Sequence, residues 1–485
     1  MMVKLLGFSP GLDPTTAGVI LDCTNLLPTV RGSMESAGVG ESVGASAIPA
    51  PVYDVSSNVK LDGSSRVFAY TGLAIYELIG AAWIDRSKAG GYTTGAGNKW
   101  RHCQFGDVSI ATNYANPVQA STIGAFADLA GSPPKAAICE TVAGFVMLFD
   151  TNDGANQHPD GWWCSGLYNH TTWTPSVTTQ AANGRLFDTP GRITAARRLG
   201  SSIVVYKNKS LYLGQYIGAP VIWQWVQVSD DTGAYCNEAV VSTGGAHYFL
   251  GDNGIFVYDG SRQEQIGTAE VRGWLRDNIN QEYTSNIKAA YDSKKSLVYF
   301  FYPSNSSSGE CDESLVYNTF TGRFGRITRD ITAIFNYTTP NITWSQLGAL
   351  YATWGGFPNN ITWGSPLFYG SDIGISYVGG DGIIYRLESD GAPSSLTVGD
   401  VGDDTAVTLL GGVRARYLKS PVSAQMENYY KRGEGDALTS DKVVSMKDFK
   451  FDVLRSSRFH RFTINFTGSH EVSAIDVNLT QNGLR

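Results

Sequence analysis

Residues 246–258, AHYFLGDNGIFVY, carry the clearest structural signal in this chain of 485 residues. Two short runs of aromatic and β-branched side chains flank the pair Asn253-Gly254. An Asn-Gly pair between two apolar runs is the strongest short-range signal for a β-hairpin, because both residues accept the positive φ angles of a tight turn. The segment therefore predicts two antiparallel strands joined by a turn.

The same pattern recurs along most of the chain. Short apolar runs followed by turns rich in Gly, Asp or Asn begin near Arg66, Cys103, Gly144, Ser202, Ala246, Ser296 and Pro366. Their mean spacing is about 50 residues, and units of about 40–50 residues with several short strands are typical of β-propellers. The sequence therefore predicts an all-β chain with a β-propeller over residues 61–390.

The number of blades stays open between two values. Segments 66–78 and 366–387 each resemble half a unit, and we expect them to share one blade. That pairing gives six blades, with seven complete blades as the alternative. Residues 1–60 are rich in Pro, Gly and Ser and predict an extended N-terminal arm, whereas residues 391–485 predict a small C-terminal β appendage. Segment 268–280 has the best helical pattern in the chain.

Composition narrows the class of protein. Charged residues make up only 17% of the chain, and 55 residues are Gly, which suits many tight turns and argues against a helical bundle. The net charge is −7 with no run of Lys or Arg, so a surface that clamps DNA is not expected. The first residues lack the apolar core of a signal peptide, and no apolar stretch is long enough to predict a membrane span.

No catalytic, cofactor-binding or metal-binding residue is predicted, and no enzymatic activity is expected. The match to G-x-S-x-G around Ser42 lies in a Gly/Ser-rich arm rather than between a strand and a helix, so we interpret it as chance. Segment 150–154 starts like a calcium loop but lacks its later acidic ligands. We interpret four aspartates as turn residues: Asp252, Asp259, Asp292 and Asp381. No metal-ligand spacing occurs among the six histidines, His102, His158, His170, His247, His460 and His470.

Three other groups of residues receive structural interpretations. Buried, reduced thiols are expected for the scattered cysteines Cys23, Cys103, Cys139, Cys164, Cys236 and Cys311. Packing between blades, rather than sugar binding, is expected for Trp162-Trp163, Trp223 with Trp225, and Trp354 with Trp363. A solvated surface, or a contact between subunits, is expected for Arg197-Arg198, Lys294-Lys295 and Lys431-Arg432.

Several stretches resemble the tail nozzle (tail hub) proteins of short-tailed, podovirus-like bacteriophages. They are GLDPTTAGVILDCTNLLPTVRG (11–32), GAYCNEAVVSTGGAHYFLGDNGIFVYDGSRQEQIG (233–267), VRGWLRDNIN (271–280), YDSKKSLVYFFYP (291–303), DESLVYNTFTGRFG (312–325) and SSRFHRFTINFTG (456–468). The resemblance spans nearly the whole chain, but it is a diffuse pattern of Gly, Asp and aromatic residues rather than a catalytic signature.

The resemblance implies a structural role in the virion tail, after assembly in the cytoplasm of the bacterial host. The chain would form a homo-hexameric ring below the portal and the head-to-tail adaptor, contact tail fibre or tailspike proteins, and conduct genomic DNA during ejection without binding it specifically. An acidic wall would let DNA slide, and the candidate loops for such a wall are 150–160, 304–310 and 390–404. The alternative is a propeller that binds or degrades host surface carbohydrate. A cellular propeller scaffold is a third class, but WD and kelch motifs are absent.

Overall fold

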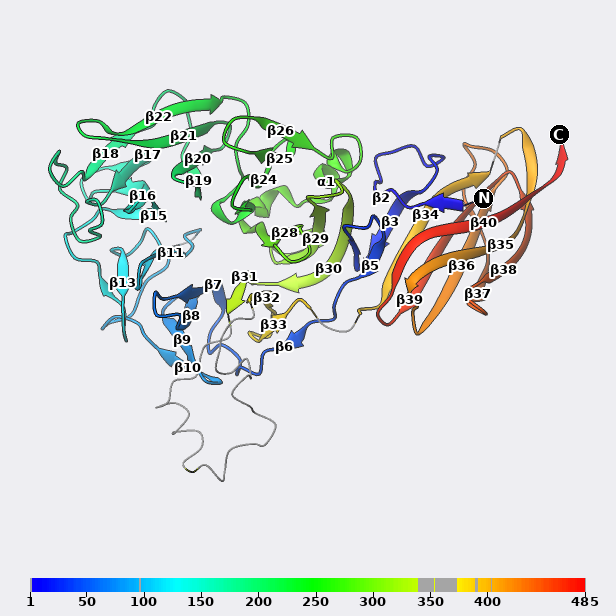
Figure 1. Cartoon of the computed structure of the whole chain (residues 1–485), viewed down its shortest axis with the longest axis horizontal. Coiled ribbons are helices and arrows are strands. Elements are labelled where there is room, and N and C mark those ends of the chain that lie inside the picture. Colours follow the sequence, from blue (N-terminus) through cyan, green and yellow to red (C-terminus); the bar gives the residue numbers. More distant parts are fainter. Residues whose placement is uncertain are drawn as a thin grey trace.

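The protein is an all-β molecule in which a β-propeller is joined to a β-sandwich (Figure 1). The computed structural model describes residues 2–95, 97–338, 353, 373–388, 391–402 and 404–484. Seven four-stranded antiparallel units form the blades, so the predicted propeller is confirmed and the larger of the two blade numbers is observed.

The first four blades follow one another along the chain, and each is built from its inner strand outward. Blade one contains β7 (Val52–Val59), β8 (Ser65–Thr71), β9 (Ile75–Ile79) and β10 (Ala82–Asp85). Blade two contains β11 (Arg101–Phe105), β12 (Val108–Thr112), β13 (Gln119–Ser121) and β14 (Ala127–Asp128). Blade three contains β15 (Lys135–Val142), β16 (Phe145–Asn152), β17 (Gln157–Cys164) and β18 (Ala182–Arg185). Blade four contains β19 (Ile193–Leu199), β20 (Ser202–Lys207), β21 (Leu211–Gly218) and β22 (Ile222–Ser229).

The last three blades include the hairpin predicted around Asn253-Gly254. Blade five contains β23 (Val240–Ser242), β24 (His247–Gly251), β25 (Gly254–Tyr258) and β26 (Gln263–Ile266). Blade six contains β27 (Lys288–Asp292), β28 (Leu297–Tyr302), β29 (Cys311–Asn318) and β30 (Phe324–Ile331). Blade seven contains β31 (Ala333–Thr338), β32 (Ile373–Val378), β33 (Ile384–Arg386) and β6 (Glu41–Ser42). The short helical elements are η1 (Asn237–Ala239), α1 (Arg272–Asn278) and η2 (Gln281–Asn286), and α1 lies inside the predicted helical segment.

The two half-units at the ends of the repeat region do not share a blade, which corrects the expectation from the sequence. Strands β8 and β9 belong to blade one, whereas β32 and β33 belong to blade seven. The fourth strand of blade seven comes instead from β6, where Ser42 pairs with Tyr385 and Glu41 with Arg386. Residues 366–369, which the sequence analysis placed in this unit, lie outside the described residues. The ring then closes where the inner strand β31 packs against β7, and Thr338 N donates to Ser57 Oγ at 3.3 Å.

Aromatic side chains fill the spaces between neighbouring blades. Trp162 of blade three lies 5.3 Å from Trp225 of blade four, measured between ring centroids, and Phe145 lies 5.6 Å from Trp223. Trp162 and Trp223 are buried, so packing between blades is confirmed for them. Trp354 and Trp363 lie outside the described residues. Close aromatic pairs add stabilisation beyond the apolar area that they remove from water.

The C-terminal part is a β-sandwich whose two sheets both take strands from the N-terminal segment. One sheet has the order β2 (Gly7–Phe8), β3 (Val19–Thr24), β34 (Ser394–Gly402), β39 (Phe459–Thr467), β36 (Ser423–Lys431) and β37 (Thr439–Ser445). The facing sheet contains β5 (Met34–Ser36), β40 (Glu471–Leu484), β35 (Ala406–Lys419) and β38 (Phe451–Ser457), with β1 (Met2–Lys4) paired to β40. Phe462, Ile464 and Phe466 point into the core between the sheets, as their alternation along the strand predicts.

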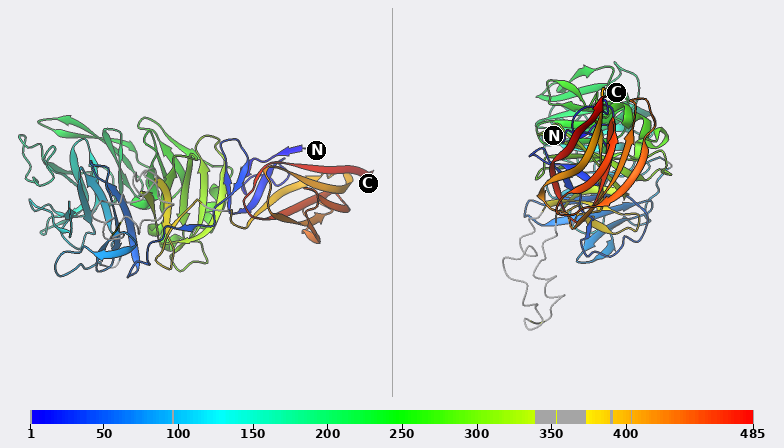
Figure 2. Two further views of the ribbon diagram at one scale, coloured as in Figure 1. Left: turned by 60° about the horizontal axis from the view of Figure 1, so that its bottom comes forward. Right: turned by 90° about the vertical axis from the view of Figure 1, so that its right-hand side faces the viewer.

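A continuous ten-stranded sheet connects the propeller to the sandwich. It runs from β27 through blade six to β30, then through β4 (Leu26–Pro28) and β5 into β40, β35 and β38. The junction is backed by side chains, because Arg326 of β30 contacts Asp22 at 2.8 Å and also Glu313. Figure 2 shows the resulting elongated molecule, with the sandwich extending from one side of the ring. Shared sheet hydrogen bonds, rather than a flexible linker, therefore hold the two parts together.

The pairing of β6 with blade seven can be tested by removing one backbone donor. Val43 N donates to Ile384 O at 3.1 Å immediately after β6. In the Val43→Pro variant this hydrogen bond is lost, and we expect the free energy of unfolding to fall by about 1–3 kcal/mol in urea titrations. Val43→Ala is the matched control, because it shortens the side chain but keeps the donor. Equal stability of the two variants would contradict closure through this strand.

Candidate functional site

The inner strands bring charged side chains from six blades together around the centre of the propeller. We call this set the axial cluster; its members are Asp54, Lys99, Arg101, Glu140, Arg197, Glu238 and Lys288. Asp54 lies on β7, Arg101 on β11 with Lys99 just before it, and Glu140 on β15. Arg197 lies on β19, Glu238 in η1 before β23, and Lys288 at the start of β27. The cluster holds four basic and three acidic groups, in contrast to the net negative charge of the chain.

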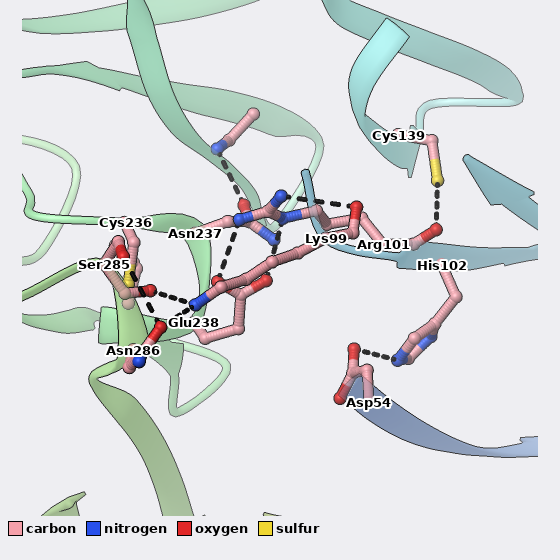
Figure 3. Close-up of polar contacts among 12 residues, drawn as sticks. Asp54, Lys99, Arg101, His102, Cys139, Cys236, Asn237, Glu238, Ser285 and Asn286 are labelled. Atoms are coloured by element: carbon pink, nitrogen blue, oxygen red, sulfur yellow. Dashed lines mark hydrogen bonds and ion pairs between the residues drawn. The ribbon is translucent and has the colours of Figure 1, made fainter. Parts of the chain in front are cut away.

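The Arg101–Glu238 ion pair is the centre of the cluster (Figure 3). Arg101 Nε lies 2.8 Å from Glu238 Oε1, and one of its terminal nitrogens donates to Oε2 at 3.1 Å. Both side chains are only 13% exposed. A two-point contact between a guanidinium and a carboxylate fixes the relative orientation of the two groups. Because blade two supplies the arginine and blade five the glutamate, the pair spans the ring.

Lys99 lies beside this pair but binds neutral oxygens. Its Nζ donates to the backbone oxygen of Ser285 at 2.5 Å and to Asn286 Oδ1 at 2.7 Å (Figure 3). Burial lowers the pKa of Lys99, and the nearby charge of Lys288 lowers it further, while Glu238 opposes the shift. The end of η2 therefore holds the ammonium group in place by dipoles rather than by a carboxylate.

Two further pairs extend the cluster around the ring. His102 Nε2 lies 3.6 Å from Asp54 Oδ2, and burial lowers the pKa of the histidine, which keeps its ring neutral at pH 7. Arg197 lies 3.9 Å from Glu140 and also donates to the backbone oxygens of Asn237 and Val240. Burial raises the pKa of Glu140, an effect that the charge of Arg197 opposes. These contacts tie neighbouring inner strands together.

Two cavities adjoin the axial cluster. The inner cavity has a volume of about 220 Å³ and is lined by inner-strand residues that include Asp54, Arg101, Arg197 and Lys288. The outer cavity, of about 820 Å³, is bordered by residues of segments 48–53, 94–95, 97–99, 309–311 and 379–382. Lys288 lines both cavities.

The basic pairs were expected at the surface; Arg198 and Arg432 are exposed, but the other member of each of these two pairs has partners inside the fold. Arg197 is part of the axial cluster, and its side chain is 27% exposed. Lys431 lies in the sandwich, where its Nζ contacts Asp400 at 2.7 Å, and Arg461 contacts the same carboxylate at 2.8 Å. Lys295 fits the surface expectation better, since it is partly exposed and pairs with Glu35. The buried partners lie far away in sequence, which is why a local pattern of two basic residues could not reveal them.

The three segments that the sequence suggested as loops lining a DNA channel have different secondary structures in the protein. Segment 150–160 contains the ends of β16 and β17, with a turn at 153–156, but Asp150 itself is buried and pairs with Arg192. Segment 304–310 is the loop between β28 and β29. The prediction of a loop at 390–404 is wrong, because β34 occupies most of this segment and Asp400 is buried. Asp390 and Asp403 lie outside the described residues.

The cysteines, Asp259 and Ser42, which the sequence analysis considered as possible functional residues, lie in the core, in a turn and on a strand. All six cysteines are free and buried, as predicted, and burial raises the pKa of the Cys236 thiol to about 11. Asp259 accepts backbone hydrogen bonds from Ser261 and Arg262 in a turn, which lowers its pKa to about 2. Ser42 lies on β6, without the strand-turn-helix geometry of a nucleophile elbow.

Two kinds of feature are absent from the described part of the chain. Within it, no group of three or more His, Cys, Asp and Glu side chains could hold a metal ion. No helix in this part is long and apolar enough to cross a membrane.

Comparisons with known proteins add little to these observations. No protein-family model and no curated protein matches the chain. A solved structure described as "YCF48 bound to D1 peptide" is 11% identical over 72% of this chain and 95% of its own, with a TM-score of 0.40. A computationally designed protein, Ika8, is 10% identical over 72% of this chain and 100% of its own, with a TM-score of 0.38. Likenesses this weak carry no argument about function.

The axial ion pair predicts a specific dependence of stability on pH. Burial alone would raise the pKa of Glu238, but the charges of Arg101, Lys99, Lys288 and Arg197 outweigh it and hold the pKa at about 2, below the ordinary value of 4.5. A lowered carboxyl pKa stabilises the fold above the ordinary value, and this contribution, about 3 kcal/mol, is lost as the pH falls from about 5 toward 2.

We therefore expect Glu238→Gln to lower the free energy of unfolding at pH 7 by about 3 kcal/mol and to flatten its decline below pH 5. Urea titrations at several pH values measure both effects. Glu264→Gln is the matched control, because Glu264 is exposed and its removal should change stability by less than about 0.5 kcal/mol. An unchanged acid profile in Glu238→Gln would contradict the role assigned to the pair.

Proposed function

We propose that this protein is a structural subunit of a bacteriophage tail nozzle, a ring that retains genomic DNA in the capsid and conducts it during ejection. The proposal rests on the sequence resemblance described above. The structural observation that favours it is the continuous ten-stranded sheet between the propeller and the sandwich. A subunit of a load-bearing ring must transmit force between its parts, and a shared sheet does so without a hinge.

In this proposal the DNA passes between subunits rather than through each propeller. The inner cavity of about 220 Å³ corresponds to a sphere only about 7.5 Å across, whereas the major groove of B-DNA alone is about 12 Å wide. The Arg101–Glu238 pair also spans the propeller ring. A conduit would therefore require several copies around a common axis, and the resemblance suggests six.

The charge of the chain supports a passive conduit. A net charge of −7 disfavours tight binding of phosphates, and the turn at 153–156 and the loop 304–310 contain no Lys or Arg. Such segments would let DNA slide if they faced the lumen. In the same proposal, the head-to-tail adaptor and tail fibre or tailspike proteins contact the ring in the virion, which is assembled in the bacterial cytoplasm.

Electron microscopy of purified tails tests the role directly. We expect this chain in a six-fold ring around the DNA channel, with six copies per particle by quantitative mass spectrometry. We also expect the isolated ring to bind duplex DNA only weakly at physiological salt. Low-micromolar binding with a steep salt dependence would contradict the passive conduit, because it requires several contacts from Lys or Arg to phosphates. Release of sugars from host surface glycans would instead favour a carbohydrate-degrading tail component.

A further inference from the structure

Lys288 is a buried residue whose ammonium group has no hydrogen-bond or ion-pair partner among the residues that the structure describes. The residue is only 7% exposed and lies at the start of the inner strand β27. Among the residues that the structure describes, no hydrogen bond or ion pair reaches its Nζ. Other buried basic groups nearby differ in this respect: Arg101 pairs with Glu238, and Lys99 donates to Ser285 and Asn286. Desolvating a charge without a counter-charge is costly, so such a residue is rarely kept for stability alone.

The acidic residues around Lys288 have other partners or face solvent. The charges of Lys99 and Lys288 lower the pKa of the nearby Glu238 carboxylate, but this carboxylate already forms an ion pair with Arg101. Asp54 in the inner cavity faces His102. At the mouth of the outer cavity, the Asp381 carboxylate accepts hydrogen bonds from Ile383 N and the Tyr385 hydroxyl, and Glu310 is exposed to solvent. None of these carboxylates contacts Lys288.

The two cavities give a small anion access to this charge. Lys288 lines both of them, so an anion in the outer cavity of about 820 Å³ can lie against its side chain. Lys99 and the polar residues Thr94 and Asn98 also line the outer cavity. A phosphate or carboxylate group fits within that volume, and charge-assisted hydrogen bonds to ammonium groups are among the stronger polar contacts in proteins.

We propose that the outer axial cavity binds a small oxyanion, a phosphate or carboxylate group, through Lys288, with Lys99 beside it. The anion supplies the counter-charge that the described part of the chain does not provide. Binding therefore stabilises the closed ring, because the residues that form the cavity come from blades one, two, six and seven. This site is independent of the proposed role in the tail.

Isothermal titration calorimetry with inorganic phosphate, and separately with acetate, tests the proposal at constant ionic strength set with chloride. We expect saturable binding of at least one of the two probes to the wild-type chain, and the stronger probe identifies the preferred oxyanion. In Lys288→Met the affinity should fall roughly ten- to hundredfold, because one charged hydrogen bond is removed. Lys209→Met is the matched control, since Lys209 is exposed, and it should bind as the wild type does.

Thermal unfolding provides a second readout that separates binding from folding. The midpoint temperature of the wild-type chain should rise with phosphate or acetate, whereas that of Lys288→Met should not rise. Without the anion, Lys288→Met should be at least as stable as the wild type, because it loses an unpaired buried charge. Absence of saturable binding in the wild type, or equal binding in Lys288→Met, would overturn the proposal.

If Lys288→Met does not fold, crystals of the wild-type chain soaked in selenate decide the question. An anomalous selenium peak about 4 Å from Lys288 Nζ, which lets a selenate oxygen accept a hydrogen bond from Nζ, would support the site. The absence of a peak there at saturating selenate would overturn it.

Discussion

The pairing of β6 with β33 is the constraint on which the rest of this structure depends. It completes the last blade and brings β31 against β7. The members of the axial cluster come from six blades, so their geometry exists only when the ring is closed. The same is true of the contact between Arg101 and Glu238, which joins blade two to blade five. A few backbone hydrogen bonds at the edge of one blade thus position ionic groups at the centre.

Sequence patterns were sufficient for the local structure. The Asn253-Gly254 turn, the hairpins of the blades and the alternation at Phe462, Ile464 and Phe466 follow from side-chain chemistry within a few residues. The role of β6 could not be found in this way, because a two-residue strand in a Gly/Ser-rich segment has no periodicity. The first blade likewise begins at Val52, within the segment that the sequence assigned to the arm.

The axial cluster could not be predicted from the sequence, for a different reason. Arg197 appeared to be half of a surface basic pair, yet its partner Glu140 and the acceptor Asn237 lie on neighbouring blades. Lys431 and Asp400 meet across the sandwich sheet in the same way. Burial of a charged residue depends on partners that only the tertiary fold brings close. An inner-strand position such as Arg197, in the run ITAARRL, is nevertheless a usable signal: a charged residue within an otherwise apolar inner strand faces the axis or a neighbouring strand.

The route of the N-terminal segment has a consequence for how the chain folds during synthesis. Residues 2–42 are synthesised before their long-range partners, which are β30, β33, β34 and β40 and end at Ile331, Arg386, Gly402 and Leu484. The last blade therefore stays incomplete until residues near 386 have been made, and β1 can pair with β40 only after residues near 476 have been made. Pairings across almost the whole chain length are slow to form and leave sheet edges exposed in the meantime. A chain that stops before these partners would thus present unpaired sheet edges.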